Sequence, residues 1–307
     1  MIVRVDDTFQ KCFVLEGAVC AFGVFDGLHL GHQYIIEQAQ KHARAINAPL
    51  AIITFAQDPD EMFNPQGLKK LMSNERRLAQ LDAFTSATVL VLPFSKAFFA
   101  LAPVVFLEKV FGQNVPAALH IGSDFRFGQR ASGTIDDLRH WGASRGMEVL
   151  GYDLFCYEGE PVTATRIRKL LAENAIEEAN KLLGAAFCLE GEVEEGRGEG
   201  RDMGFRTANV TIPAQLYSLG EGVYGAYAVT EEGKRYKAAV SVGGAPTFGE
   251  ASHANIEAHI LDFDQDIYGQ KLRLEFVEYL RPLMVFPSVD VLIETVMDNI
   301  QWCRDNL

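Results

Sequence analysis

The sequence predicts an α/β domain built on a parallel sheet, followed by an antiparallel six-stranded β-barrel and a C-terminal helix. Short apolar strands alternate with helical patterns in the first half of the chain, which is typical of parallel sheets covered by helices. From residue 187 the strand patterns follow one another without intervening helices, until one helical pattern closes the chain. With 307 residues, 48% of them hydrophobic, the chain is long enough for two cores, and we expect domains at 1–185 and 186–307.

The first domain contains five expected strands, at residues 19–25, 50–55, 88–92, 118–122 and 147–152. Helical patterns lie between them, at residues 32–47, 74–85, 103–111 and 134–145. The strands are almost continuously apolar, which indicates a sheet buried on both faces. Ligands of such sheets bind beyond the carboxyl ends of the strands, so we expect the functional residues directly after the strands.

The second domain follows two short helical patterns, at residues 163–171 and 176–183, the latter ending at the C-cap residue Gly184. Six strand patterns separated by glycine-rich turns predict a small closed barrel, at residues 187–194, 208–212, 223–229, 235–242, 256–263 and 272–279. After Pro287 the apolar residues keep the spacing of a helix packed on a core, at Val289, Leu292, Ile293, Val296, Met297, Ile300 and Cys303.

Charge and cysteine content exclude several classes of protein. The net charge of −13 argues against a nucleic-acid-binding surface. No apolar run reaches the length of about 18 residues that a membrane span needs, and the N-terminus lacks the pattern of a signal peptide. The five cysteines are scattered and form no Cys-x-x-Cys pair, which fits reduced thiols in the cytoplasm.

The most informative motif lies where the first predicted strand passes into a helix, and it contains His29 and His32. The start of a helix favours anions through free N–H groups and the helix dipole, and Gly27 and Gly31 allow close approach of the backbone. These features predict a nucleotide phosphate site. The alternative is a helix cap or surface feature without a ligand. A metal site is not expected, since the nearby sequence offers no third ligand at suitable spacing.

Two further motifs follow later elements. Residues 121–129 place Phe125 and Phe127 between polar residues after a strand, which suits a flat heteroaromatic ligand, although the residues alone favour burial of both rings in the core. Thr165, Arg166 and Arg168 open a helix, where a hydroxyl group and arginine forks suit phosphate oxygens. An ordinary capped and solvated helix start is the alternative there.

In this order and spacing, the motifs resemble the adenylyltransferase half of bacterial bifunctional riboflavin kinase/FAD synthetases, over about 170 residues. The resemblance implies a Rossmann-like nucleotidyltransferase with an HxGH motif that adenylylates FMN to FAD with ATP. It implies catalytic roles for His29, His32 and Arg166. It implies binding roles for Gly23, Phe25, Asp26, Gly27, Gly31, Asp124, Phe125, Phe127, Gly128, Thr165 and Arg168. Asp58 stands where the family has the histidine of Pro-His-Pro, and Val24 stands at an often polar position.

The C-terminal half resembles the riboflavin kinase part of the same family. Residues 196–209 contain a glycine-rich loop and a Gly-Phe-Arg-Thr-Ala-Asn segment, in which Arg206 replaces the family's proline. The resemblance implies Mg²⁺ ligands at Thr207 and Asn209, nucleotide contacts at Gly198, Gly204 and Asn209, and a general base at Glu257. Read without the resemblance, the loop fits a flexible surface turn, and Glu257 fits an outward-facing strand residue.

The implied substrates and products are ATP with Mg²⁺, riboflavin, FMN and FAD, and flavoproteins are the implied recipients. Two alternatives stay open at this point. Asp58 and Val24 are compatible with a monofunctional riboflavin kinase that has a degenerate adenylyltransferase domain. Asp58 and Arg206 are compatible with a regulator that binds flavins or nucleotides without catalysis.

Overall fold

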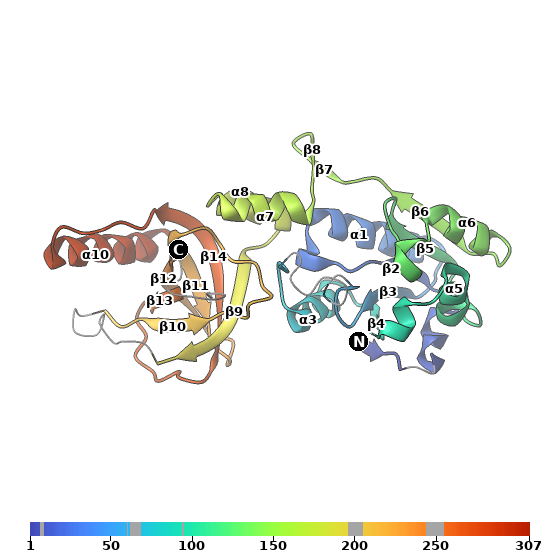
Figure 1. The fold of residues 1–307 in the computed structure, drawn as a ribbon, viewed down its shortest axis with the longest axis horizontal. Helices are drawn as coiled ribbons and strands as arrows, with labels where there is room; N and C mark the ends of the chain where they lie inside the picture. Colours follow the sequence, from blue (N-terminus) through green and yellow to red (C-terminus); the bar gives the residue numbers. More distant parts are fainter. Residues whose placement is uncertain (7–8, 60, 62–68, 94, 196–204, 244–254) are drawn as a thin grey trace. The chain divides into compact units, whose positions relative to one another are not determined.

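The computed structural model describes residues 1–6, 9–59, 61, 69–93, 95–195, 205–243 and 255–307. The chain divides into two compact units (Figure 1). One comprises Met1–Leu68 and Ser73–Ala164, and the other comprises Lys69–Met72 and Thr165–Leu307. The domain boundary after residue 185 stays a prediction.

The first unit is built on a six-stranded parallel sheet with the order β1-β4-β3-β2-β5-β6, which confirms the predicted class. The strands are β1 (Ile2–Arg4), β2 (Val19–Phe22), β3 (Leu50–Phe55), β4 (Thr88–Leu92), β5 (Ala118–Gly122) and β6 (Glu148–Tyr152). Strand β2 ends at Phe22 rather than at the predicted Phe25, because the backbone of Phe25 is left-handed, with φ 62°.

Helices cover both faces of this sheet. One core packs α1 (Leu30–Ala45) and α3 (Asn74–Phe84) against it, and the other packs α4 (Lys96–Phe99), α5 (Pro103–Phe111) and α6 (Ile135–Ala143). The remaining elements are three 3₁₀ turns and a small hairpin: η1 (Gln10–Leu15), η2 (Asp26–Leu28), η3 (Gln129–Ala131), β7 (Cys156–Tyr157) and β8 (Glu160–Pro161). The two buried faces explain why the strands are apolar throughout.

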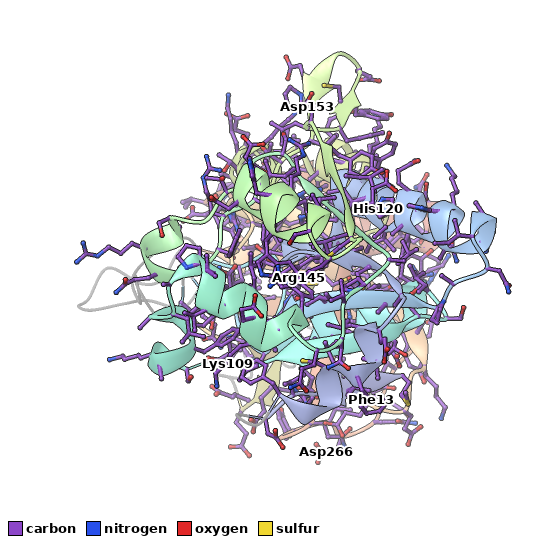
Figure 2. All side chains as sticks on the ribbon, turned by 90° about the vertical axis from the view of Figure 1, so that its right-hand side faces the viewer. Phe13, Lys109, His120, Arg145, Asp153 and Asp266 are labelled. Atoms are coloured by element: carbon purple, nitrogen blue, oxygen red, sulfur yellow. The ribbon has the colours of Figure 1, made fainter. Side chains whose placement is uncertain are left out.

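A chain of polar contacts, centred on the buried His120, connects α1 to the sheet. His120, labelled in Figure 2, is 1% exposed and lies on β5. Its Nε2 atom is 3.0 Å from Nδ1 of His42 on α1, and its Nδ1 atom is 2.8 Å from the hydroxyl group of Tyr152. Glu148 lies 3.8 Å from the other side of the His42 ring. Burial, with a contribution from His42, lowers the pKa of His120 to about 4, so this ring is neutral at pH 7.

The second unit begins with α7 (Ala164–Ala172) and α8 (Ile176–Leu183) and continues as a closed antiparallel barrel. The barrel order is β10-β13-β12-β11-β14-β9, which confirms the six predicted strands. Their bounds are β9 (Phe187–Glu194), β10 (Ala208–Thr211), β11 (Gly222–Val229), β12 (Arg235–Gly243), β13 (Asn255–Ile260) and β14 (Lys271–Arg281). The predicted C-terminal helix is α10 (Val289–Asn306), which packs on the barrel (Figure 1).

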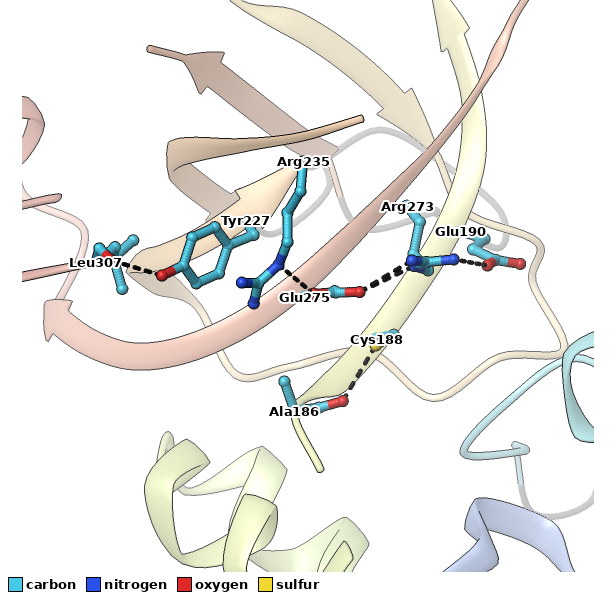
Figure 3. A network of polar contacts seen from close by, with 8 residues as sticks. All are labelled: Ala186, Cys188, Glu190, Tyr227, Arg235, Arg273, Glu275 and Leu307. Carbon is cyan, nitrogen blue, oxygen red and sulfur yellow. Dashed lines mark hydrogen bonds and ion pairs between the residues drawn. The ribbon is translucent and has the colours of Figure 1, made fainter. Parts of the chain in front are cut away.

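Polar contacts on the barrel wall anchor the end of α10. The hydroxyl group of Tyr227 donates to the carbonyl oxygen of Leu307 at 2.6 Å, and Lys237 donates to that of Arg304 at 2.5 Å. Beside Tyr227, Arg235 binds Glu275 at 2.9 Å, as part of the network in Figure 3. Cations near the last carbonyl groups of a helix also offset its dipole.

All five cysteines are free thiols, and Cys156 is the exposed one among them. Within the described part of the chain, none of the helices combines the length and the apolar character needed to cross a membrane.

Candidate active sites

The His29–His32 turn lies at the topological switch point of the parallel sheet. Strand β2 pairs with β3 on one side and with β5 on the other, and the chain builds the two halves of the sheet outward from there. Open parallel sheets bind their ligands at the carboxyl ends of the strands beside such a point. Two of the predicted motifs, at residues 21–32 and 121–129, begin in the last residues of β2 and β5 and continue past their carboxyl ends.

The turn itself is tight and left-handed. Phe25, Gly27 and Leu28 have φ values of 62°, 76° and 39°, and non-glycine residues adopt such values at a cost of about 1–3 kcal/mol. His29 then caps α1, since its carbonyl oxygen and its Nδ1 atom accept from the backbone N–H of His32 at 2.8 and 3.4 Å. The first turn of α1 is therefore fixed with its N–H groups at the switch point.

The two histidine rings form a stacked pair. Their centroids are 3.7 Å apart at an interplanar angle of 16°, and Phe25 meets His32 edge-on at 5.4 Å. Burial, and then the neighbouring His29, lower the pKa of His32 well below its ordinary value of 6.5. The Nδ1 atom of His32 is buried without a hydrogen-bond partner among the described residues. Buried polar atoms are rarely left unsatisfied, so this nitrogen fits a bound ligand.

Gly31 keeps the surface of this turn open. A Cβ atom at this position would lie 3.2 Å from the His29 ring and 3.5 Å from the carbonyl oxygen of Val162. A side chain would therefore press on the histidine pair and fill the space over the helix start. An anionic phosphate group fits this place, because the place combines the unsatisfied Nδ1 atom of His32, the missing side chain of Gly31 and the N-terminus of α1.

The motif after β5 separates into buried and accessible residues. Phe127 is 4% exposed and packs against Phe106 at 5.4 Å in the core, as the alternative interpretation expected. Phe125 is half-buried, 4.8 Å from Phe22, and Asp124 is exposed. Gly128 has φ 70°, and its place against Pro103 leaves no room for a side chain. The ring of Phe127 thus packs in the core, while Phe125 and Asp124 are accessible.

Sequence reasoning missed Arg77, which the structure places at this end of the sheet. Its side chain is 2% exposed and its guanidinium group donates to the carbonyl oxygen of Val24 at 2.9 Å. Asp58, the unusual carboxylate, is 9% exposed and interacts electrostatically with Arg77. The available signal was spacing, because Arg77 shares the buried face of α3 with Leu78 and Leu81.

Thr165, Arg166 and Arg168 lie on α7, which belongs to the second unit. Arg168 is 8% exposed and donates from Nε to the carbonyl oxygen of Lys69 at 2.8 Å, so it is not part of a solvated helix start. Arg166 is half-buried and Thr165 is exposed. The roles of these three residues beside the histidines stay predictions.

In the barrel, the predicted kinase residues meet across neighbouring strands. Asn209 on β10 is directly opposite Glu257 on β13, and Ser241 on β12 is opposite Glu257 on its other side. By the same register His259, next but one to Glu257, comes opposite Thr207. The Nδ1 atom of His259 lies 2.8 Å from the carbonyl oxygen of Arg206, which fixes the backbone just before Thr207. Gly198 and Gly204 lie outside the described residues.

Two cavities flank these strands, and Thr207 lines both. The larger, of about 550 Å³, is also lined by Asn209, Arg206 and three carboxylates, Glu195, Asp264 and Asp266. Hydroxyl, amide and carboxylate oxygens are the ligands that Mg²⁺ prefers, so this donor set fits the metal of a nucleotide complex. In the described residues, no three His, Cys, Asp or Glu side chains gather as an all-protein metal site.

The smaller cavity, of about 260 Å³, lies between the barrel and α10. Its walls include Phe205, Met284, Phe286, Leu292 and Val296, with polar groups from Ser241, Glu257, Arg281 and Asn299. Apolar walls with a few polar groups suit a flat ring system. Glu257 therefore faces a ring-sized cavity that shares its wall residue Thr207 with the oxygen-rich cavity.

Comparison with known proteins decides the family. The family model described as FAD synthetase matches residues 13–166, and the family model described as riboflavin kinase matches residues 183–307. The chain belongs to the bifunctional riboflavin kinase/FMN adenylyltransferase family. The bifunctional riboflavin kinase/FMN adenylyltransferase of Haemophilus influenzae is 31% identical over 95% of this chain and 94% of its own length. That of Escherichia coli K12 is 30% identical over 95% and 91%.

A solved structure from Streptococcus pneumoniae, named a macrolide-efflux protein, shares the whole fold. It superposes with a TM-score of 0.86 and 28% identity, covering 100% of this chain and 99% of its own. The likeness extends over both units, so the family's two domains occur here on one chain.

Proposed function

We propose that this protein makes FAD from riboflavin in two ATP-dependent reactions, one in each unit. The proposal rests on the presence of both family domains on one chain. The observation that carries it furthest is Thr207, which lines both an oxygen-rich cavity and a ring-sized cavity. A phosphoryl group can pass between two substrates only where their sites adjoin in this way.

In the barrel, riboflavin kinase activity uses these two cavities together. The 5′-hydroxyl oxygen of riboflavin attacks the γ-phosphorus of ATP, and FMN and ADP leave. Thr207 and Asn209 would hold Mg²⁺, which would neutralise phosphate charge, and phosphate contacts at Gly198 and Gly204, outside the described residues, are what the resemblance implies. Glu257 takes the hydroxyl proton, and its place opposite Asn209 supports that role. Such transfers depend mainly on positioning and charge neutralisation.

In the parallel-sheet unit, FMN adenylyltransferase activity uses the switch-point turn. A phosphate oxygen of FMN attacks the α-phosphorus of ATP, and FAD and pyrophosphate leave. His29 and His32 stabilise the charge that develops on the phosphoryl oxygens, and a role for Arg166 of α7 is what the family resemblance implies. Within this unit, nucleotide and flavin binding falls to Gly23, Phe25, Asp26, Gly27, Gly31, Asp124, Phe125 and Gly128, while the Phe127 ring supports the segment from the core. The unpaired Nδ1 atom of His32 supports this assignment.

The electrostatics around Asp58 favour the bifunctional enzyme over a kinase with a degenerate partner domain. An uncompensated carboxylate would repel a triphosphate, but this one has the buried Arg77 guanidinium beside it. We place both reactions in the cytoplasm. Riboflavin, FMN and ATP are the partners, nucleic acid is not, and flavoproteins receive the products.

Two variants separate the reactions. Glu257→Gln should strongly slow FMN formation from riboflavin, yet still convert supplied FMN into FAD. His32→Asn should convert riboflavin into FMN and stop there. Chromatography resolves the three flavins in each incubation with ATP and Mg²⁺. A Glu257→Gln protein that phosphorylates riboflavin normally, or a His32→Asn protein that makes FAD normally, would overturn the assignment of that site.

A further inference from the structure

A buried arginine lies at the carboxyl ends of β2 and β3, beside the candidate nucleotide turn. Arg77 projects from the first turns of α3, and its side chain is 2% exposed. Helix α3 packs against η2, the short turn that follows β2. A guanidinium group is costly to remove from water unless its N–H groups find acceptors. Its acceptors therefore define what this side chain holds together.

Both terminal nitrogens of Arg77 are engaged by the protein. Nη1 donates to the carbonyl oxygen of Val24 at 2.9 Å and to the hydroxyl oxygen of Thr54 at 2.7 Å. Nη2 donates to the carbonyl oxygen of Phe55 at 2.8 Å and to the amide oxygen of Asn74 at 3.1 Å. The planar fork thus ties the ends of two neighbouring parallel strands to the start of α3.

Val24 is where this clamp reaches the candidate active site. It directly precedes Phe25, whose backbone turns left-handed and leads through η2 to His29 and His32. A left-handed phenylalanine persists only where its surroundings over-determine the conformation. The bond from Arg77 to the carbonyl oxygen of Val24 fixes the peptide plane that enters this turn.

We propose that Arg77 is a positioning residue for adenylyl transfer, which holds the turn carrying His29 and His32 through the carbonyl oxygen of Val24. This inference rests on the proposed FMN adenylyltransferase function. Arg77 is not assigned to the substrates, because its terminal nitrogens already have acceptors within the protein. It acts through the histidines, whose placement controls how well they stabilise the transition state.

Asp58 supplies part of the opposite charge. Burial lowers the pKa of Arg77, and the charges of Asp58, Asp26 and Glu61 oppose that shift. Glu61 is also linked to the clamp, since it accepts from Nδ2 of Asn74 at 3.2 Å. Asp58 is 9% exposed and lies two residues after Ala56, whose carbonyl oxygen is 3.5 Å from Nη2 of Arg77. The carboxylate that replaces the family's histidine thus lies close to a structural cation, and its removal should be felt through Arg77.

The test compares Arg77→Lys, Arg77→Met, Thr54→Val, Asp58→Asn and the double variant Asp58→Asn/Arg77→Met. Arg139→Met, which removes a half-exposed arginine of the same unit, is the matched control. FMN adenylyltransferase kcat and the KM for ATP are measured on the full chain, with thermal unfolding. The riboflavin kinase activity of each preparation, which belongs to the other unit, reports intact protein.

We expect both Arg77 variants to lower the adenylyltransferase kcat about tenfold or more, with the KM for ATP changing much less. Lysine should not rescue, because an ammonium group cannot serve four acceptors in a plane. Thr54→Val should give a smaller loss in the same direction. In the double variant Asp58→Asn/Arg77→Met, the changes in kcat and in the unfolding temperature should be clearly smaller than the sum of the changes in the two single variants. The Mg²⁺ concentration that Asp58→Asn requires should match that of the wild type.

Folded Arg77→Lys and Thr54→Val proteins with kcat within twofold of the wild type would overturn the positioning role, even if Arg77→Met fails to fold. Additive effects of the Asp58 and Arg77 substitutions, or a raised Mg²⁺ requirement in Asp58→Asn, would overturn the role of Asp58 as a counter-charge for Arg77. Failure of the proposed function looks different, since the wild type would then make no FAD. The unfolding measurements would still test the Asp58–Arg77 coupling in that case.

Discussion

Replacing His259 by leucine removes a hydrogen bond that holds the metal-binding segment of the barrel. A carbonyl oxygen can only accept, so the Nδ1 atom of His259 donates to Arg206 across 2.8 Å. Arg206 stands where the family has proline, and it therefore lacks the fixed φ that a proline ring imposes. The contact from His259 restrains the backbone directly before Thr207.

The size of the effect follows from the value of one hydrogen bond. A net contribution of about 0.5–1.5 kcal/mol corresponds to a change of about 2- to 13-fold in the population of the restrained segment. We expect His259→Leu to raise the KM for Mg-ATP in the riboflavin kinase reaction by a factor in that range. His259→Asn should recover most of the loss, because an amide nitrogen can donate from nearly the same position.

The assay follows FMN formation at varied Mg-ATP, and separately at varied riboflavin, with FMN adenylyltransferase activity measured on the same samples. His140→Leu, which replaces a histidine on the surface of the other unit, serves as the control. A His259→Leu protein with wild-type KM for Mg-ATP would refute the restraint. Equal losses in His259→Leu and His259→Asn would show that ring volume, and not the hydrogen bond, matters.

Three further predictions concern single side chains. Glu257→Gln should lower the riboflavin kinase kcat by about 10²–10⁴-fold, whereas Glu275→Gln on the barrel wall should leave it unchanged in the same assay. His120 has a folded-state pKa of about 4, below its unfolded value. Its contribution to the free energy of unfolding is therefore fully present above pH 6.5 and is lost as the pH falls towards 4. Unfolding of the wild type from pH 7 to 4.5 should show this loss, of about 3 kcal/mol at most, and His120→Asn should flatten it. Tyr224→Phe should cost about 1–3 kcal/mol in urea unfolding, because the buried hydroxyl group donates to Asn174 at 2.6 Å; an unchanged midpoint would contradict this.

The main elements of both units were predictable because their patterns are strong. Strands β3, β4 and β5 and helix α5 have the predicted bounds, since apolar runs and a proline at the helix start mark them clearly. Strand β1 was missed because Ile2–Arg4 is short and is defined by its pairing with β4. The end of β2 was placed too late because apolar character does not reveal the left-handed backbone of Phe25.

The candidate sites were predictable where residue type and local geometry agree. His29 and His32 follow a strand and open a helix, and two glycines beside them signal close approach. Arg77 was missed because a charged residue in a helical pattern is ordinarily interpreted as solvent-exposed, and because its acceptors lie far from it in the sequence, at the ends of β2 and β3. The restraint from His259 was equally hidden, since it depends on the register between β13 and the segment before β10.

The most direct test of the whole account is a time course with the wild-type protein, riboflavin, ATP and Mg²⁺. Chromatography of the flavins and of the released ADP and pyrophosphate should show FMN rising first and FAD following. At each time the ADP should equal the sum of FMN and FAD, and the pyrophosphate should equal the FAD. FMN that accumulates without FAD or pyrophosphate would contradict the adenylyltransferase assignment, and flavin that stays riboflavin throughout would contradict the account altogether.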